Sequence, residues 1–281
     1  MFQKLDTQNS DQTRVPQRSP FRYAGGKTWL IPKIRQWLRH QGGTDKEMIE
    51  PFAGSGIVSL TAVCENLVDR ATMVEKDEGV AAVWQIILNG GAVWLADAIM
   101  RFQLTPETAK RAIDRADESL ESLAFATIIK NRVNRGGILA DGASFIKNGE
   151  NGKGITSRWY PATLKKRILT IDQIKHKIHF IQGDAFEVCE KNACRNNVVY
   201  FIDPPYIKSG QRLYRYSDID HKALFDLANR LQGDFLMTYD NVTEAQALAS
   251  RCKFETKLIA MKNTHHARKT ELIIGKDLTW L

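Results

Sequence analysis

The sequence contains few cysteines and none of the spacings that bind metal ions. Its four cysteines, in a chain of 281 residues, form no CxxC pair; they are Cys64, Cys189, Cys194 and Cys252. This excludes a zinc-ribbon framework and a small disulfide-stabilised fold. We therefore expect no metal, and isolated buried thiols in a reducing cytoplasm.

Long hydrophobic runs are also missing. No run approaches the roughly 18 to 20 uncharged apolar residues that a membrane span needs. Residues 1–19 lack the apolar centre of a secretory signal and are predicted to be a disordered polar tail that ends near Pro20. We expect a cytoplasmic protein with no membrane partner. The 43% hydrophobic content is enough for a full α/β core.

Acidic residues are scarce between residues 130 and 180. This stretch carries eleven lysines and arginines but only three acids, and the difference of eight equals the formal net charge of the whole chain, +8. A basic segment on a neutral body predicts a polyanionic partner. A solvated basic face fits the charge equally well.

Seven short runs of apolar and β-branched residues are predicted to be strands. They are residues 47–52, 71–77, 178–184, 197–203, 234–240, 256–262 and 270–275. Their near-continuous hydrophobicity is typical of strands that are covered on both faces. Helical patterns follow several of them, at residues 55–66, 220–231 and 243–252. The sequence therefore predicts an α/β fold with a doubly wound, mostly parallel sheet.

Residues 97–177 interrupt this alternation. Thr105 and Pro106 are typical of a helix start, and a second helix is predicted over residues 119–134. Residues 135–154 contain six glycines and two Asn-Gly pairs, which predict a mobile loop. We expect a small helical insertion domain, residues 97–177, within a catalytic domain formed by residues 20–96 and 178–281.

The first chemical motif is EPFAGSG, residues 50–56, directly after a predicted strand. Gly54 and Gly56 let the backbone approach a ligand, and the following helix offers free N–H groups. The next strand ends near Glu75 and Asp77, where nucleotide-binding α/β folds bond ribose hydroxyls, and either acid fits. The dinucleotide pattern GxGxxG is absent. An adenosine derivative without a pyrophosphate is therefore favoured as the ligand.

The second motif is DPPY, residues 203–206, at the end of another predicted strand. Its prolines remove N–H donors, so an accepting carboxylate, an accepting carbonyl and an aromatic ring come together. The Asp203 carboxylate and the Pro204 carbonyl would accept the two hydrogens of a ring amine, while Tyr206 would stack on the ring. The amine would then point at a methyl donor. A simple turn after a buried strand is the alternative.

A third motif, FRYAGGK at residues 21–27, does not fit the Walker pattern. Together the three motifs resemble the Dam-like family of DNA adenine-N6 methyltransferases, in the class with motif X at the N-terminus, then motif I, a recognition domain and DPPY as motif IV. TYDN, residues 238–241, resembles motif VI of the family, and residues 267–274 resemble its closing strand. The resemblance covers residues 20–96 and 178–281.

The resemblance implies the fold of S-adenosylmethionine-dependent methyltransferases and a site-specific enzyme that methylates N6 of adenine in DNA after base flipping. It implies a cofactor site lined by Tyr23, Lys27, Phe52, Gly54, Gly56, Glu75, Asp184, Phe186 and Asp203. Asp184 and Phe186 would lie against the adenine ring of the cofactor. Asp203, Pro204 and Tyr206 would hold the target base. Core packing explains Phe52 and Phe186 equally well.

In such a family the insertion would bind double-stranded DNA, through phosphates or guanine edges. The residues expected to do so are Arg132, Arg135, Arg158, Lys165, Lys166 and Arg167. The local sequence departs from the family here, so no recognition sequence is implied. Trp159 and Tyr160 equally suit the core of a small domain.

Several alternatives stay open at this stage. Cytosine N4 or an RNA substrate would suit a similar site, and a DNA-binding subunit without catalysis would share the fold. A restriction endonuclease is a candidate partner if the protein serves restriction-modification rather than a phage or orphan role. A monomer or weak dimer is expected.

Overall fold

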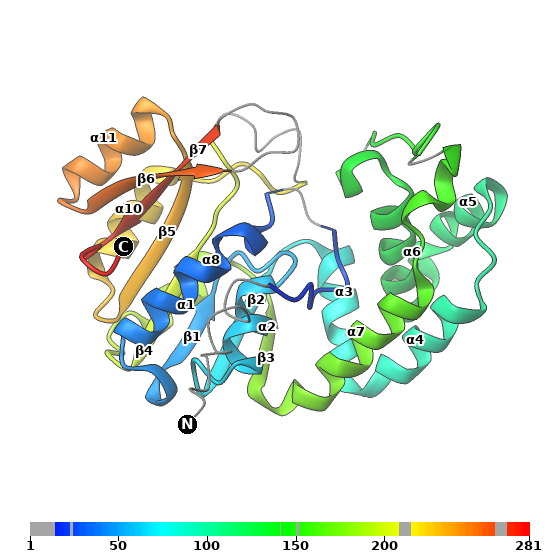
Figure 1. The fold of residues 1–281 in the computed structure, drawn as a ribbon, viewed down its shortest axis with the longest axis horizontal. Coiled ribbons are helices and arrows are strands. Elements are labelled where there is room, and N and C mark those ends of the chain that lie inside the picture. The colour runs from blue at the N-terminus through cyan, green and yellow to red at the C-terminus, as the bar shows by residue number, and fades with distance from the viewer. Residues whose placement is uncertain (1–14, 23–24, 141, 150–151, 208–214, 262–268) are drawn as a thin grey trace, which may run out of the picture.

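A seven-stranded sheet forms the centre of the molecule (Figure 1). The computed structural model describes residues 15–22, 25–140, 142–149, 152–207, 215–261 and 269–281. The strands are β1 (Glu47–Glu50), β2 (Arg70–Glu75), β3 (Ile178–Gln182), β4 (Val198–Ile202), β5 (Asp234–Asp240), β6 (Glu255–Met261) and β7 (Lys269–Gly275). Their order is β3-β2-β1-β4-β5-β7-β6, and β7 is antiparallel to both neighbours. All seven predicted strands and the doubly wound, mostly parallel sheet are confirmed.

Helices cover both faces of this sheet. One face carries α1 (Ile31–His40), α2 (Ile57–Cys64) and α3 (Glu78–Ile86), and the other carries α8 (Ala185–Asn192), α10 (His221–Arg230) and α11 (Thr243–Arg251). Successive strand side chains point to opposite faces. Met73 accordingly packs in the first core and Val74 in the second. Burial on both faces explains why these strands are apolar without alternation.

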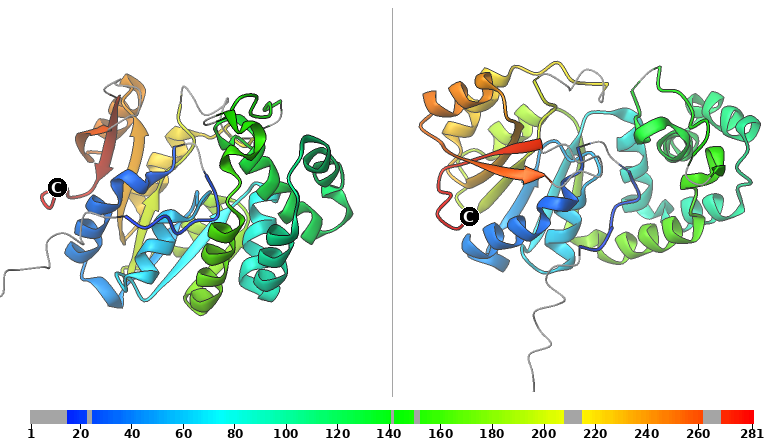
Figure 2. Two further views of the ribbon diagram at one scale, coloured as in Figure 1. Left: turned by 45° about the vertical axis from the view of Figure 1, so that its right-hand side comes forward. Right: turned by 45° about the horizontal axis from the view of Figure 1, so that its top comes forward.

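The insertion is helical, as predicted, and lies beside the sheet on the side of α3 (Figures 1 and 2). Its helices are α4 (Ala92–Arg101), α5 (Pro106–Asp114), α6 (Leu120–Val133) and α7 (Pro161–Ile174). Thr105 caps α5, since its hydroxyl accepts a hydrogen bond from the Thr108 N–H. α4 packs along α7, and α3 packs along α6.

This packing joins the insertion to the body of the protein. Leu164 and Ile168 of α7 belong to the same core as α1 and α2. The insertion also has a smaller hydrophobic cluster of its own, around Leu104, Ile129 and Val133. Residue 97, the predicted start of the insertion, lies inside α4. The insertion is therefore an extension of the main core as much as a separate unit.

Short turns connect these elements. Single 3-10 turns lie at Lys27–Leu30, Gly43–Asp45, Ala116–Glu118, Arg135–Gly137, Gly154–Arg158 and Lys175–Lys177, and a π-turn lies at Ile87–Gly91. In the glycine-rich stretch, Asn134 and Phe145 form an isolated bridge. The described part of residues 135–154 contains no strand of the sheet, as predicted.

The N-terminal segment differs from the prediction. Residues 1–14 of the predicted tail lie outside the described residues, but residues 15–19 pack against the body. Val15 contacts the main core, Arg18 pairs with Glu65 at 3.0 Å, and Ser19 is buried. The ordered chain therefore begins before Pro20. Polar composition alone gave no sign of these contacts.

One segment is more hydrophobic than the sequence analysis allowed. Glu78–Arg101 is long and apolar enough to cross a membrane by length and composition, with a mean hydropathy of 1.5 in its most apolar window. In this fold it is α3, the π-turn and α4, interrupted at Gly90, where φ is +99°. The window is 56% buried within the protein. Its composition therefore matches that of core helices.

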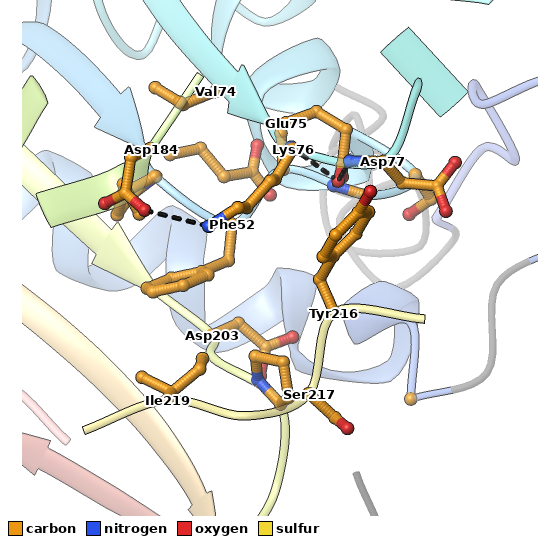
Figure 3. Close-up of a pocket in the computed structure, with 18 of the residues that line it drawn as sticks. Phe52, Val74, Glu75, Lys76, Asp77, Asp184, Asp203, Tyr216, Ser217 and Ile219 are labelled. Atoms are coloured by element: carbon orange, nitrogen blue, oxygen red, sulfur yellow. Dashed lines mark hydrogen bonds and ion pairs between the residues drawn. The ribbon is translucent and has the colours of Figure 1, made fainter. Parts of the chain in front are cut away.

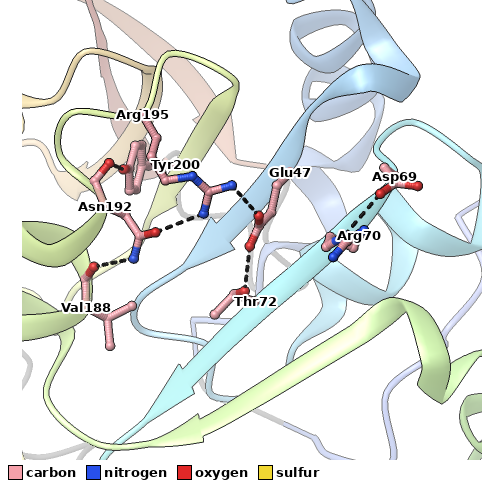
Figure 4. Close-up of polar contacts among 8 residues, drawn as sticks. All are labelled: Glu47, Asp69, Arg70, Thr72, Val188, Asn192, Arg195 and Tyr200. Atoms are coloured by element: carbon pink, nitrogen blue, oxygen red, sulfur yellow. Dashed lines mark hydrogen bonds and ion pairs between the residues drawn. The ribbon is translucent and has the colours of Figure 1, made fainter.

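Polar contacts fasten the sheet at the amino ends of its strands (Figure 4). Glu47 at the start of β1 accepts hydrogen bonds from Thr72 of β2 at 2.9 Å and from Arg195 at 2.7 Å. Arg195 also donates to Asn192 at the end of α8, and the Tyr200 hydroxyl of β4 donates to the Asn192 carbonyl. This network joins β1, β2, β4 and α8 at the end of the sheet opposite the cavity described below.

Candidate active site

A cavity of about 590 Å³ lies at the carboxyl ends of β1 to β4 (Figure 3). The connections of the sheet reverse direction between β1 and β4, and open α/β sheets bind ligands at such a point. Most residues predicted for the cofactor line it: Lys27, Phe52, Gly54, Glu75, Asp184, Phe186 and Asp203. Phe52 and Phe186 also pack against the core under α8 and α10, so both interpretations of these rings hold. Tyr23 lies outside the described residues.

The two glycines of EPFAGSG have different tasks. Both have positive φ, +47° at Gly54 and +60° at Gly56. Gly54 lines the cavity, and its N–H donates to Glu75 at 2.9 Å. A Cβ atom on Gly56 would lie 2.6 Å from the Cε of Met73 and 3.0 Å from Cζ2 of Trp84. Gly56 does not line the cavity, so its predicted contact with the cofactor is replaced by close packing against β2 and α3.

Glu75 and Asp77 both line the cavity. Glu75 Oε1 accepts the N–H groups of Lys76 and Asp77 at 2.8 Å each, and Asp77 Oδ1 caps α3 by accepting the Val80 N–H. Burial raises the pKa of Glu75 to about 7. A carboxylate oxygen accepts more than one hydrogen bond. Each carboxylate therefore holds the backbone of its loop by hydrogen bonds and can still accept a hydrogen bond from a ligand in the cavity.

Asp184 joins the same wall of the cavity. Its Oδ1 accepts the Phe186 N–H at 2.8 Å and caps α8, and its Oδ2 lies 3.2 Å from the Lys76 ammonium (Figure 3). The loops after β2 and β3 are therefore joined across the mouth of the cavity. The cap also fixes Phe186 at the first turn of α8.

Asp203 stands at the end of β4 and is held on one oxygen. Its Oδ1 accepts a hydrogen bond from the Thr238 hydroxyl of β5 at 2.7 Å and lies 2.8 Å from the Lys27 ammonium. The side chain is 20% exposed and lines the cavity. Among the described residues both contacts fall on Oδ1, so Oδ2 is the oxygen left for a ligand. Thr238 begins the TYDN motif.

Lys27 is buried between two carboxylates. Its side chain is 2% exposed, and Nζ lies 3.2 Å from Glu271 Oε1 and 3.1 Å from the Tyr206 hydroxyl. That hydroxyl donates to Glu271 at 2.7 Å. Burial raises the pKa of Glu271, whose side chain is 1% exposed. Lys27 therefore lines the cavity and also pairs with Asp203 and Glu271; its predicted role towards the cofactor stays a prediction.

Sequence reasoning missed Glu271. It is the one acid in the apolar run TELIIG of β7. A carboxylate in a buried strand is rare unless it is paired, so its position was a usable signal. We name the four side chains of Lys27, Asp203, Tyr206 and Glu271 the lysine network.

The remaining DPPY residues frame the cavity less directly. Pro205 lines it, whereas Pro204 is buried and Tyr206 belongs to the lysine network. The irregular segment after them adds Tyr216, Ser217 and Ile219 to the wall (Figure 3). These three had no pattern by which sequence analysis would select them.

Glu50, the first residue of EPFAGSG, is a second missed carboxyl. It lines the bottom of the cavity with 3% exposure and accepts hydrogen bonds from the N–H and hydroxyl of Ser59. It therefore ties the end of β1 to α2. Burial raises the pKa of Glu50 from its ordinary 4.5 to about 8.

This shift predicts a pH effect on stability. The folded protein keeps a proton on Glu50 that the unfolded chain releases above about pH 4.5, so stability falls as the pH rises towards about 8. Glu50→Gln mimics the protonated carboxyl. We expect its free energy of unfolding, measured by urea denaturation, to change less between about pH 5 and pH 8 than that of the wild type. Equal pH dependence of the two proteins would show that Glu50 is already ionised at pH 5.

The six residues predicted to bind DNA differ in their exposure. Arg135 and Lys166 are exposed, and Arg158 is half-buried. Lys165 pairs with Asp97 at 2.8 Å. Arg167 is half-buried, and Arg132 is 4% exposed. Arg132 contacts the N-terminal segment, where its Nη2 donates to the Pro20 carbonyl. That these six residues bind DNA stays a prediction.

The sheet order, the antiparallel β7 and the cavity at the β1–β4 reversal are those of the S-adenosylmethionine-dependent methyltransferase fold, as predicted. A family model described as D12 class N6 adenine-specific DNA methyltransferase matches residues 23–70. The match spans Lys27, β1 and the glycine loop, and it confirms the predicted family resemblance. The sequence matches no curated protein.

Solved structures of methyltransferases align with most of the chain. They include an rRNA methyltransferase, aviRa, from Streptomyces viridochromogenes (12% identity, 96% of this chain and 94% of that chain, TM-score 0.39). A methyltransferase from Geobacter sulfurreducens matches at 10% identity over 90% and 80% of the two chains, with a TM-score of 0.41. A precorrin-6y C5,15-methyltransferase from Geobacter metallireducens matches at 12% over 87% of each, with a TM-score of 0.38. Such low identities say nothing about the substrate.

Proposed function

We propose that the protein transfers a methyl group from S-adenosylmethionine to N6 of adenine in DNA. The observation that carries this proposal is Asp203, a carboxylate at the rim of the cavity whose Oδ1 is held by Thr238 and Lys27. Such a group suits an amine that must be oriented towards a methyl donor. The family match over residues 23–70 supports adenine N6 as the acceptor.

The cavity fits the proposed cofactor. Gly54, with its positive φ, brings backbone to the wall, the Glu75 and Asp77 carboxylates suit ribose hydroxyls, and Phe52 and Phe186 supply flat apolar surfaces. S-Adenosylmethionine supplies an electrophilic methyl group when bound. A volume of about 590 Å³ is within the range of small-molecule sites.

Asp203 would act on the amine in two ways. Oδ2 would accept one N–H and thereby fix the direction of the nitrogen lone pair. As the new C–N bond forms, the bond between the methyl carbon and the sulfonium sulfur would break, and S-adenosylhomocysteine would leave with that electron pair. Positive charge would develop on the nitrogen, and the nearby carboxylate would stabilise it. The amine then loses one proton, and Oδ2 is the acceptor nearest to it. Thr238 and Lys27 keep the carboxylate fixed during these steps, so little reorganisation is needed.

Cofactor affinity tests the acids after β2. We expect Glu75→Gln to weaken S-adenosylmethionine binding about tenfold or more, because hydrogen bonds to charged groups contribute roughly 1.5 to 3 kcal/mol. Asp77→Asn is the matched variant, and the larger loss identifies the acid that holds the ribose. Isothermal titration calorimetry gives both dissociation constants. Wild-type affinity in both variants would remove these acids from the cofactor site.

The acceptor is tested by labelled methyl transfer. Wild-type protein is incubated with S-adenosylmethionine carrying a radioactive methyl group and, in separate reactions, with unmethylated genomic DNA and total RNA. We expect label in DNA only. Label in RNA alone would assign the same chemistry to another substrate.

A further inference from the structure

A second cavity, of about 420 Å³, lies between the N-terminal segment and the helices α6 and α7. Three arginines border it, namely Arg22, Arg132 and Arg167, and no acidic residue of the described chain does. Ser55 and Ile57 border both this cavity and the candidate active site, so the two spaces adjoin. We name this space the arginine cavity.

Arg132 is the least satisfied group in its wall. The side chain belongs to α6 and is 4% exposed, and Nη2 donates to the Pro20 carbonyl. Its Nε is buried and has no hydrogen-bond partner among the described residues. Burial, together with the charges of Arg167 and Arg22, lowers the pKa of Arg132 to about 9. A buried cation without an anion costs stability, so the cavity favours a negatively charged ligand.

Arg167 completes the site from α7. Its Nη1 donates to the Ser19 carbonyl at 3.1 Å, and burial lowers its pKa. The two guanidinium groups thus come from different helices and are both fixed by carbonyls of the N-terminal segment. Side chains that are already fixed in the free protein lose little conformational entropy when a ligand binds. Planar guanidinium groups also match the geometry of phosphate oxygens.

We propose that the arginine cavity is a phosphate-binding site that takes one phosphate of the DNA strand whose adenine enters the active site. The proposal rests on the proposed function. Tyr160 borders the same cavity with 54% exposure, and an exposed ring beside a phosphate site is typical of nucleic-acid binding. The cofactor's carboxylate suits the cavity less well, because it would bring its own ammonium group beside three arginines.

The first test measures DNA affinity against salt concentration. Each phosphate contact contributes about 0.9 to the slope of log K against log salt. Arg167→Gln should weaken binding of the full-length protein to a fluorescent duplex several-fold and make the slope shallower by about that amount. Lys110→Gln removes the same charge from an exposed position on α5, outside the cavity, and should change neither quantity. Equal behaviour of the two variants would overturn the proposal.

The second test observes Arg132 directly in wild-type protein. Arginine is labelled with nitrogen-15, and the Nε–H signal of Arg132 is assigned by its loss in Arg132→Lys. We expect this signal to shift on adding duplex DNA, whether or not inorganic phosphate alone moves it. No shift with DNA, or a shift with S-adenosylmethionine alone, would overturn the site. Methylation of the DNA is measured in the same sample, so an inactive protein, which counts against the proposed function, is distinguished from an active one with an unresponsive Arg132.

Discussion

Asp203→Ala abolishes methyl transfer and leaves the fold and cofactor affinity near those of the wild type. The carboxylate lies at the end of β4 with 20% exposure, so its removal opens no large hole in the core. Lys27 loses one partner but keeps its ion pair with Glu271, so the buried ammonium is not left without an anion. The variant lacks the group that orients the amine and stabilises its developing charge. We expect the methylation rate to fall by about 10³-fold or more. Single-turnover methylation of DNA measures the loss, and calorimetry with S-adenosylmethionine measures cofactor affinity.

Thr238→Val is the graded control for this prediction. It removes one of the two groups on Asp203 Oδ1 but keeps the carboxylate and the shape of the β5 side chain. We expect an intermediate rate, with cofactor affinity unchanged. Near-wild-type turnover of Asp203→Ala would contradict the proposed mechanism, whatever Thr238→Val does.

Lys27→Met lowers both stability and turnover. It removes the one cation of the lysine network and leaves Asp203 and Glu271 without their ion pairs. Removing one partner of a buried ion pair costs about 3 to 5 kcal/mol. Urea denaturation measures the stability loss. Turnover falls because Asp203 loses the ammonium that fixes Oδ1.

The double variant Lys27→Met/Glu271→Gln separates the two effects. It removes the unpaired carboxylate at Glu271, so part of the stability returns, while turnover stays low because Asp203 is still unsupported. Recovery of turnover together with stability would mean that Lys27 acts on the fold alone. A weaker cofactor affinity as the sole defect of Lys27→Met would support the role that the sequence predicted for it.

The sheet could be predicted from the sequence because its strands are buried on both faces. Runs such as residues 197–203 and 234–240 are too apolar for surface loops and too short for typical helices. Their positions match β4 and β5 closely. Glu75 and Asp203 were found for a related reason. Each stands where an apolar run ends, and the ends of parallel strands meet at one edge of a sheet.

The contacts across the fold could not be predicted in the same way. Lys27 and Glu271 are 244 residues apart, and only the pairing of β7 with β5 brings them together. The burial of Arg132 had no signal in its basic sequence neighbourhood, because its contact with the Pro20 carbonyl joins residues 112 positions apart. The start of the insertion was misplaced because α4 is equally apolar on both sides of residue 97.

Mass spectrometry of nucleosides tests the central claim most directly. Unmethylated genomic DNA is incubated with the protein and with S-adenosylmethionine that carries a deuterated methyl group, and Asp203→Ala serves as the matched inactive sample. We expect labelled N6-methyladenine from the wild type and none from the variant. Labelled N4-methylcytosine, or no labelled base in DNA exposed to a folded wild-type protein that binds the cofactor, would contradict it.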